Sequence, residues 1–145
     1  SRGLKSLDLD WNALHGEGAR AFLVGLHDNG VDPGGKLRRL SLAWNRLGSG
    51  SHIDQAWKKA ATTCAKVLAD IFRDGEKLFH LDLSYNGFTA DDCELLARGL
   101  VANHTLFGIH LVGNEAAMDS NGFVVPLQPG GSSGLQSYLP EGSLP

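Results

Sequence analysis

Four segments of the chain share one alternation of leucine and polar residues. Each reads leucine, two variable residues, leucine, one variable residue, leucine, two variable residues and asparagine. The copies are LKSLDLDWN, LRRLSLAWN, LFHLDLSYN and a weaker LFGIHLVGN, and they begin the units we number one to four at residues 4, 37, 78 and 106. Because side chains alternate along a strand, the leucines should point inward and the residues between them outward. The pattern predicts four short strands.

Every copy ends in an asparagine at the same offset, which indicates a structural role. A turn follows each strand, and its buried backbone groups need hydrogen-bond partners. A side-chain amide can both donate and accept there. We therefore expect a ladder of stacked asparagines formed by Asn12, Asn45, Asn86 and Asn114.

A helical pattern follows the strand in the first three units. In unit three, apolar residues recur at three- or four-residue spacing over residues 90–100, and Thr89 or Asp91 could cap the helix start. Residues 18–26 of unit one follow a similar spacing. Unit two is longer, and residues 51–75 are typical of one extended helix on which Trp57 would overhang its neighbours.

Unit four departs from the pattern after its asparagine. An Asn-Gly pair at residues 121–122 and Pro126 disfavour a full helix. We expect a degenerate closing unit that covers the last open face. Residues 128–145 are rich in Gly, Ser and Pro and should form a C-terminal tail.

Long units with a true helix resemble the leucine-rich-repeat family, in particular its ribonuclease-inhibitor-like class. The resemblance covers roughly residues 4–127. It implies an α/β fold: a right-handed solenoid of about four units, with short parallel strands on the concave face and helices on the convex face. The leucine-rich-repeat domain would occupy residues 1–127. Members of this class are typically cytosolic or nuclear and bind proteins, so the resemblance implies protein partners and no chemistry.

Composition narrows the partner classes. The 145 residues carry a net charge of −3, and no Lys/Arg cluster exceeds two neighbours, which disfavours nucleic acid and membrane surfaces. Apolar runs are too short to span a membrane. Cys64 and Cys93 lack metal-ligand spacing and should be buried free thiols in a reducing compartment, so we expect a cytoplasmic protein without cofactors.

The outward positions form columns across the strands. Directly before the asparagines the column contains Trp11, Trp44 and Tyr85, residue types that favour a binding hot spot; packing over the turn below is the alternative. A basic patch on a partner would face the aspartates, and an apolar or cationic group would stack on the aromatic rings. The candidate partner-binding residues are Asp8, Asp10, Trp11, Arg39, Trp44, His80, Asp82, Tyr85 and His110.

The histidines raise the hypothesis that the protein is a metal-dependent enzyme. His80, Asp82 and His110 fall on adjacent strands and could bind a metal ion. We expect instead a surface hydrogen bond between His110 and Asp82, because the face is open and offers no further ligand. Neither a phosphate-binding loop nor a nucleophile elbow is present in the sequence. The chain is therefore predicted to hold no metal and to be no enzyme.

The sequence thus predicts a non-catalytic protein-interaction module or scaffold. It would be part of a larger protein or assembly, such as a cytoskeletal or axonemal one. The alternative is a regulator of an enzyme, either a small-GTPase activator or an enzyme inhibitor of the leucine-rich-repeat type. Unit one has no cap, so we expect further repeats or a neighbouring subunit against Leu4 and Leu7.

Overall fold

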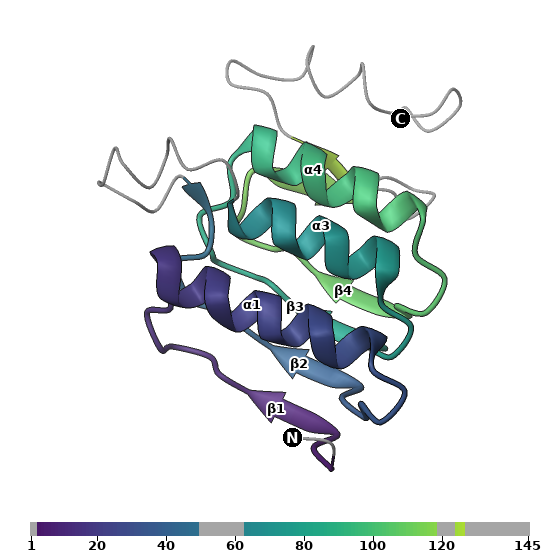
Figure 1. Cartoon of the computed structure of the whole chain (residues 1–145). Helices are drawn as coiled ribbons and strands as arrows, with labels where there is room; N and C mark the ends of the chain where they lie inside the picture. Colours follow the sequence, from purple (N-terminus) through teal and green to yellow (C-terminus); the bar gives the residue numbers. More distant parts are fainter. Residues whose placement is uncertain (1–2, 50–62, 119–123, 127–145) are drawn as a thin grey trace.

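A parallel sheet with helices along one of its faces forms the body of the protein (Figure 1). The computed structural model describes residues 3–49, 63–118 and 124–126. The strands, in sheet order, are β1 (Ser6–Asp8), β2 (Arg39–Ser41), β3 (His80–Asp82) and β4 (Gly108–His110). The helices are α1 (Gly16–Val31), α3 (Cys64–Asp74) and α4 (Ala90–Val101). The predicted α/β class with four short parallel strands is confirmed.

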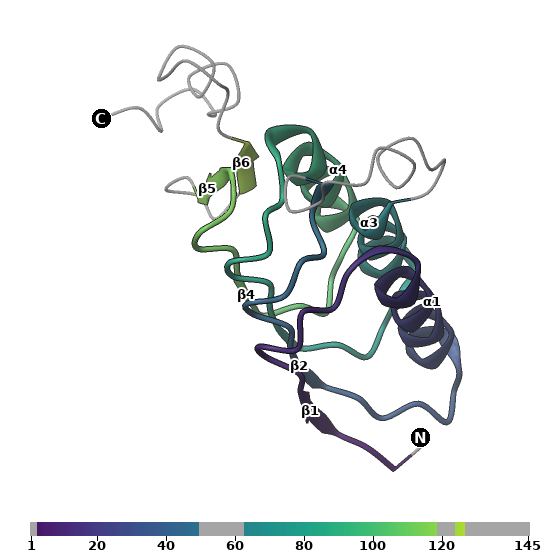
Figure 2. The ribbon, with the colours of Figure 1, turned by 90° about the vertical axis from the view of Figure 1, so that its left-hand side faces the viewer.

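Equivalent positions of the four units lie side by side. Leu7, Leu40, Leu81 and Ile109 are partners in the strand register. The backbone pairing continues beyond the strands. The Leu9 N–H, for example, donates to the Ser41 carbonyl of unit two at 2.9 Å. In Figure 2, the segments that follow the strands run next to one another. The units therefore stack in register although their starts are 33, 41 and 28 residues apart.

The core lies between the sheet and the helices. The second and third leucines of units two and three point into it and are almost fully buried, as the alternation predicts. Apolar side chains of the three helices close it from the other side. Its largest fully buried members are Phe72, Phe88, Leu23, Leu40, Leu42, Leu47, Leu68, Leu81, Leu83, Leu96 and Asn86. Burial of this apolar surface is the main force that holds the units together.

Helix α4 begins with the capping residue that its sequence indicates. The Thr89 hydroxyl accepts the Asp92 N–H at 3.2 Å, and the Asp92 carboxylate accepts the Thr89 N–H at 3.1 Å. This reciprocal pair satisfies two of the donors that a helix start leaves unpaired. Of the two candidates, Thr89 and not Asp91 is the N-cap.

Helix α3 is shorter than the extended helix predicted over residues 51–75. It begins at Cys64, because Thr63 is in an extended conformation and its hydroxyl accepts the Lys66 N–H at 3.3 Å. A threonine that caps a helix start cannot also lie inside the helix. The prediction is wrong at this point, and its earlier part, which includes Trp57, lies outside the described residues.

After Asn114 the chain forms two short strands, β5 (Ala116–Met118) and β6 (Val124–Pro126), which pair antiparallel. Strand β6 lies against α4, at the end of the row of units. In the described part of this segment no helix forms, in agreement with the sequence pattern.

Helices α1 and α3 are joined by a pair of polar side chains. The His27 Nε2 lies 2.9 Å from an Asp74 carboxylate oxygen, and Arg73 donates to the same carboxylate. The hydrogen bonds from Arg73 and then from His27 hold the pKa of Asp74 well below its usual range. The stability that Asp74 contributes is therefore present above the usual aspartate pKa and is lost as the pH falls below it.

Both cysteines are buried and unpaired, which confirms the prediction of free thiols. Burial, and then the negative charge of Asp92, raises the pKa of both the Cys64 and the Cys93 thiol to about 12. Because the thiolate is the reactive form, both thiols should be inert while the protein is folded.

We expect a thiol reagent such as DTNB to leave the native protein largely unlabelled at neutral pH and to label two thiols per chain in concentrated guanidinium chloride. Absorbance of the released thiolate measures both values. Fast labelling of either thiol in the native state would contradict the described packing of α3 or α4.

Candidate protein-interaction surface

The turn after each of the first three strands is held by the asparagine of the next unit. The Asn45 Oδ1 accepts the backbone N–H groups of Asn12 and Leu14, both at 3.0 Å. Its Nδ2 donates to the carbonyls of Leu9 at 3.0 Å and Leu42 at 2.9 Å. One amide thus satisfies groups of two units at once. Asn12 itself is exposed at the start of this row.

The same arrangement continues through the next two units. The Asn86 Nδ2 donates to the Leu42 carbonyl at 2.8 Å, and its Oδ1 accepts the Leu47 N–H at 3.3 Å. The Asn114 Oδ1 accepts the N–H groups of Asn86 and Phe88, both at 3.0 Å. The structure therefore brings all four asparagines together in register. This row fixes the position of the residue directly before each asparagine.

The residue before each asparagine lies in the left-handed region of backbone space. The φ angles are 61° for Trp11, 59° for Trp44, 56° for Tyr85 and 79° for Gly113. Each of the three aromatic residues is held by the sheet pairing; the Trp44 N–H, for example, donates to the Ser84 carbonyl at 2.9 Å. This conformation favours glycine and is strained for a large side chain. Only unit four carries the glycine.

Trp11, Trp44 and Tyr85 form one continuous stack, which we call the aromatic ladder. The ring centroids of Trp11 and Trp44 lie 4.3 Å apart and those of Trp44 and Tyr85 lie 4.0 Å apart, with interplanar angles of 9° and 8°. A Cβ atom at Gly113 would lie 2.2 Å from the Tyr85 ring, so the glycine leaves room for the last ring. The exposed fractions are 69%, 42% and 40%, with Trp11 the most open.

The three aspartates of the predicted surface also bind backbone groups. The Asp10 carboxylate accepts the Ser41 hydroxyl at 2.6 Å and the Ala43 N–H at 2.9 Å. Asp8 and Asp82 each accept the N–H two residues further on, both at 2.9 Å. In each of these contacts the acceptor is Oδ1. The acidic residues thus support the ends of the strands next to the aromatic ladder.

The outer face of the sheet carries Arg39, His80, Asp82 and His110. The hydrogen bond expected there between His110 and Asp82, both described residues, does not form. Asp82 is the register partner of His110, yet among the described residues these two form no hydrogen bond. Instead, the Nε2 atoms of His80 and His110 lie 3.0 Å apart. The expected His110–Asp82 contact is therefore replaced by a diagonal contact between the histidines.

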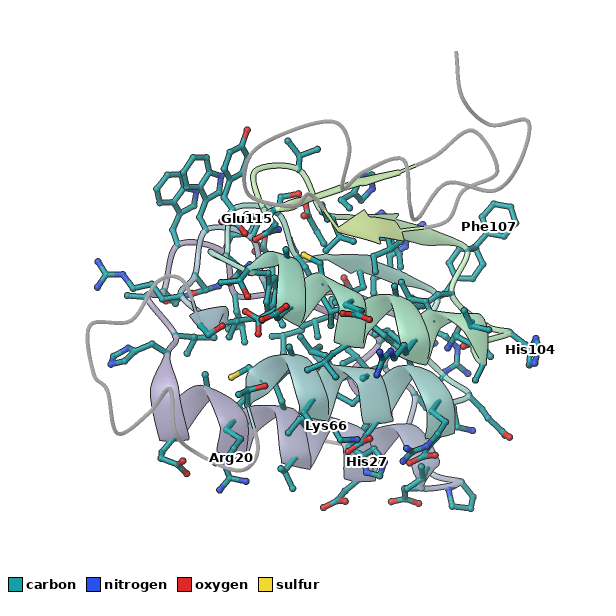
Figure 3. All side chains as sticks on the ribbon, turned by 90° about the horizontal axis from the view of Figure 1, so that it is seen from above. Arg20, His27, Lys66, His104, Phe107 and Glu115 are labelled. Carbon is teal, nitrogen blue, oxygen red and sulfur yellow. The ribbon has the colours of Figure 1, made fainter. Side chains whose placement is uncertain are left out.

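A second aromatic pair was missed by the sequence reasoning. The ring centroids of Phe79 and Phe107 lie 5.4 Å apart with an interplanar angle of 6°, and their exposed fractions are 42% and 84%. Phe107 projects outward at the same end of the molecule as His104 (Figure 3). The signal was available, because both phenylalanines directly follow the first leucine of their unit.

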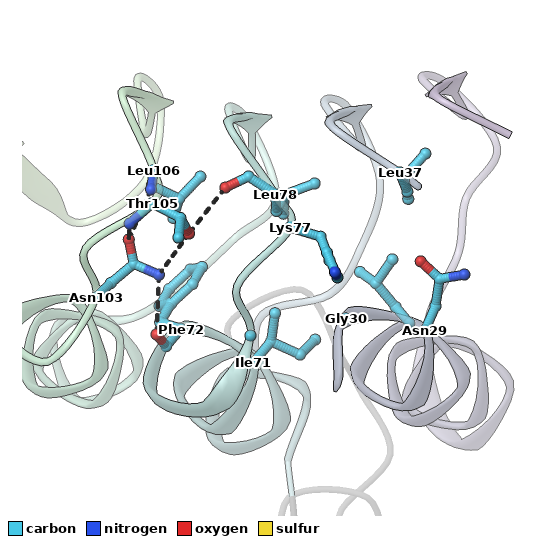
Figure 4. Close-up of a pocket in the computed structure, with 12 residues that line it drawn as sticks. Asn29, Gly30, Leu37, Ile71, Phe72, Lys77, Leu78, Asn103, Thr105 and Leu106 are labelled. Carbon is cyan, nitrogen blue, oxygen red and sulfur yellow. Dashed lines mark hydrogen bonds between the residues drawn. The ribbon is translucent and has the colours of Figure 1, made fainter. Parts of the chain in front are cut away.

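A small apolar pocket lies between the helix ends and the strand starts (Figure 4). The first leucines of units two to four line it. Asn103 closes one side, donating to the Phe72 carbonyl at 2.9 Å and accepting the Leu106 N–H at 2.7 Å. The lining is typical of packing between units and contains no pair of acidic or basic groups suited to proton transfer.

Within residues 3–49, 63–118 and 124–126, no three His, Cys, Asp or Glu side chains gather as ligands for a metal ion. In the same part of the chain, no helix combines the length and the apolar character that crossing a membrane requires.

The fold and the exposed sheet face define a repeat protein made of strand–helix units. Residues 1–23 and 76–97 match the family described as Leucine Rich repeat, and these matches contain the strands of units one and three. Together with the parallel sheet, they support an α/β leucine-rich-repeat protein, and such repeats generally mediate protein–protein interactions. The comparison with curated proteins gives no match for this chain.

Proposed function

We propose that this chain is a non-catalytic protein-interaction module that binds its partner through the aromatic ladder and the adjacent outer face of the sheet. The units would form a right-handed solenoid of the ribonuclease-inhibitor-like class, with the sheet on its concave side. The module would act in the cytoplasm as a scaffold within a larger protein or assembly.

The observation that carries this proposal is that the aromatic ladder is exposed and stands at backbone positions that favour glycine. A non-glycine residue in the left-handed region costs about 1–2 kcal/mol, so Trp11, Trp44 and Tyr85 together cost roughly 3–6 kcal/mol. Two stacked pairs contribute about 1–3 kcal/mol in addition to the area that the rings bury. The three residues nevertheless remain 40–69% exposed, and a binding role explains why large exposed rings stand at strained backbone positions.

The surface suggests the chemistry of the partner. Both faces of the Trp44 ring are covered by its neighbours, so a partner reaches the ladder at the ring edges and at the outer face of Trp11. Asp10 directly precedes Trp11 in the chain and Asp8 lies two residues before Asp10, so both bring negative charge to that end. A basic patch carrying an apolar or cationic side chain fits this combination.

Replacing Trp11 with glycine should separate binding from folding. The change removes the most exposed ring and also relieves its backbone strain, so the free energy of unfolding should stay within about 1 kcal/mol of the wild type. Partner capture from native extract should weaken by about 2 kcal/mol, or roughly 30-fold. Quantitative mass spectrometry of the captured proteins and denaturant titration measure the two effects.

Val24→Ala is a matched control, because Val24 is an exposed apolar residue on helix α1, away from the ladder. It should leave capture unchanged. Equal capture by the wild type and by the Trp11→Gly variant would refute the proposal. A single soluble partner that exchanges reversibly would favour the enzyme-regulator alternative over a scaffold, which should instead elute with a large assembly.

A further inference from the structure

We propose that His80 and His110 form a two-histidine binding site for a divalent transition-metal ion, and that copper(II) fits it best. The site is independent of the aromatic ladder and needs no third protein ligand, because water can complete the coordination. It is a binding site and carries no hydrolytic chemistry.

The geometry of the two rings is the first argument. The Nε2 atoms face each other at 3.0 Å across neighbouring strands. Their ring planes are inclined at 51°, so the rings are not stacked, and it is their Nε2 edges that meet. With metal–nitrogen bonds of about 2.0–2.1 Å, nitrogens at this separation make an angle of roughly 90–100° at the ion.

At this separation of the nitrogens, some metal ions fit better than others. A tetrahedral ion such as zinc would hold the same two nitrogens about 3.3–3.4 Å apart. A near-right angle suits the square-planar or tetragonal coordination of copper(II) and nickel(II), and copper(II) binds imidazole more tightly than the other divalent ions of its row. The pair can accept the ion without backbone movement, since the ring that donates the hydrogen bond needs only to carry its proton on Nδ1 instead.

The backbone around the pair makes this approach possible. Gly108 is the register partner of His80, and a Cβ atom there would lie 2.8 Å from the Cδ2 of the His80 ring. The His80 ring therefore occupies space that any other residue at position 108 would fill. Because of this space, the His80 ring lies over its own partner position and reaches across it to His110.

The surroundings neither repel nor trap a cation strongly. Arg39 is the register partner of His80 on one side, and Asp82 is the register partner of His110 on the other. The two opposite charges flank the pair on the outer face. His110 is exposed and His80 is partly exposed, so an ion can enter from solvent and keep water ligands.

Titration of the full chain with copper(II) in a non-coordinating buffer tests the proposal. We expect one tight ion per chain by calorimetry, and the electron paramagnetic resonance spectrum should show coupling to two nitrogens. Removing either ring breaks the chelate, so His80→Ala and His110→Ala should each weaken binding at least about tenfold, and the double variant should be little worse than either.

The matched control is His104→Ala, which removes another exposed histidine and should leave the tight site intact. A second variant, Gly108→Ala, keeps both ligands but displaces the His80 ring, so it should also weaken copper binding in a chain that remains folded by circular dichroism. If His80→Ala binds copper as tightly as His104→Ala does, or if the spectrum reports one nitrogen, the two-histidine site does not exist.

Discussion

Asn86→Ala is expected to lower the free energy of unfolding by about 3 kcal/mol, among the largest effects of any single substitution in this chain. Asn86 is fully buried, and its amide donates to the carbonyls of Leu42 and Leu83 while accepting the Leu47 N–H. Alanine would leave these buried groups without that partner and would also create a cavity. Urea unfolding followed by tryptophan fluorescence measures the change.

Asn12→Ala provides the comparison at the exposed start of the same row. The Asn12 amide donates to the carbonyls of Leu9 and Asp10, but water can replace these bonds because the residue is exposed. We expect a loss of no more than about 1 kcal/mol. If both variants lost the same stability, burial could not be the reason that the row holds the units together.

Gly99→Ala should destabilise the protein by about 2–3 kcal/mol, although alanine is the better helix former. A Cβ atom at Gly99 in α4 would lie 2.6 Å from the Ala69 carbonyl oxygen and 2.8 Å from the Ala69 Cα in α3. Both are backbone atoms, so relief requires α3 and α4 to move apart. Thermal unfolding by circular dichroism should show the lower midpoint.

Gly25→Ala in α1 should act in the opposite direction. Nothing lies within 4 Å of a Cβ atom at Gly25. The helix preference then acts alone and should stabilise the protein by about 0.5–1 kcal/mol. Two identical substitutions inside helices would thus have opposite signs, and a stabilising Gly99→Ala would show that the two helices are not in close contact.

The leucine pattern was sufficient to predict the sheet. Four leucine-containing copies with one alternation specify which residues face the core, and their shared offset specifies which residues become neighbours. The start of α4 was predicted to within two candidate caps, Thr89 and Asp91, of which Thr89 is the N-cap. These features depend on local chemistry that repeats, which is why the sequence alone reveals them.

Other features could not be predicted from the sequence. They depend on which of two local structures is more stable, or on the space left between neighbouring strands. The apolar spacing before Cys64 continues without a break, yet helix α3 begins after Thr63, because the Thr63 hydroxyl accepts the Lys66 N–H. The contact between His80 and His110 arises because Gly108 leaves a gap for a ring, and a reading of direct register partners selects Asp82 instead. The strained φ angles of the aromatic ladder are visible only in the backbone.

The register of the units also has a practical consequence for protein engineering. Units two and three begin 41 residues apart and units three and four 28 residues apart, yet both junctions are joined by the same amide-to-backbone contacts. The length of chain between two units therefore does not set how their strands align. A reporter peptide inserted between residues 49 and 63 should leave Trp44 and Tyr85 at their present separation, so this position suits a tether for immobilising the protein with its aromatic rings free.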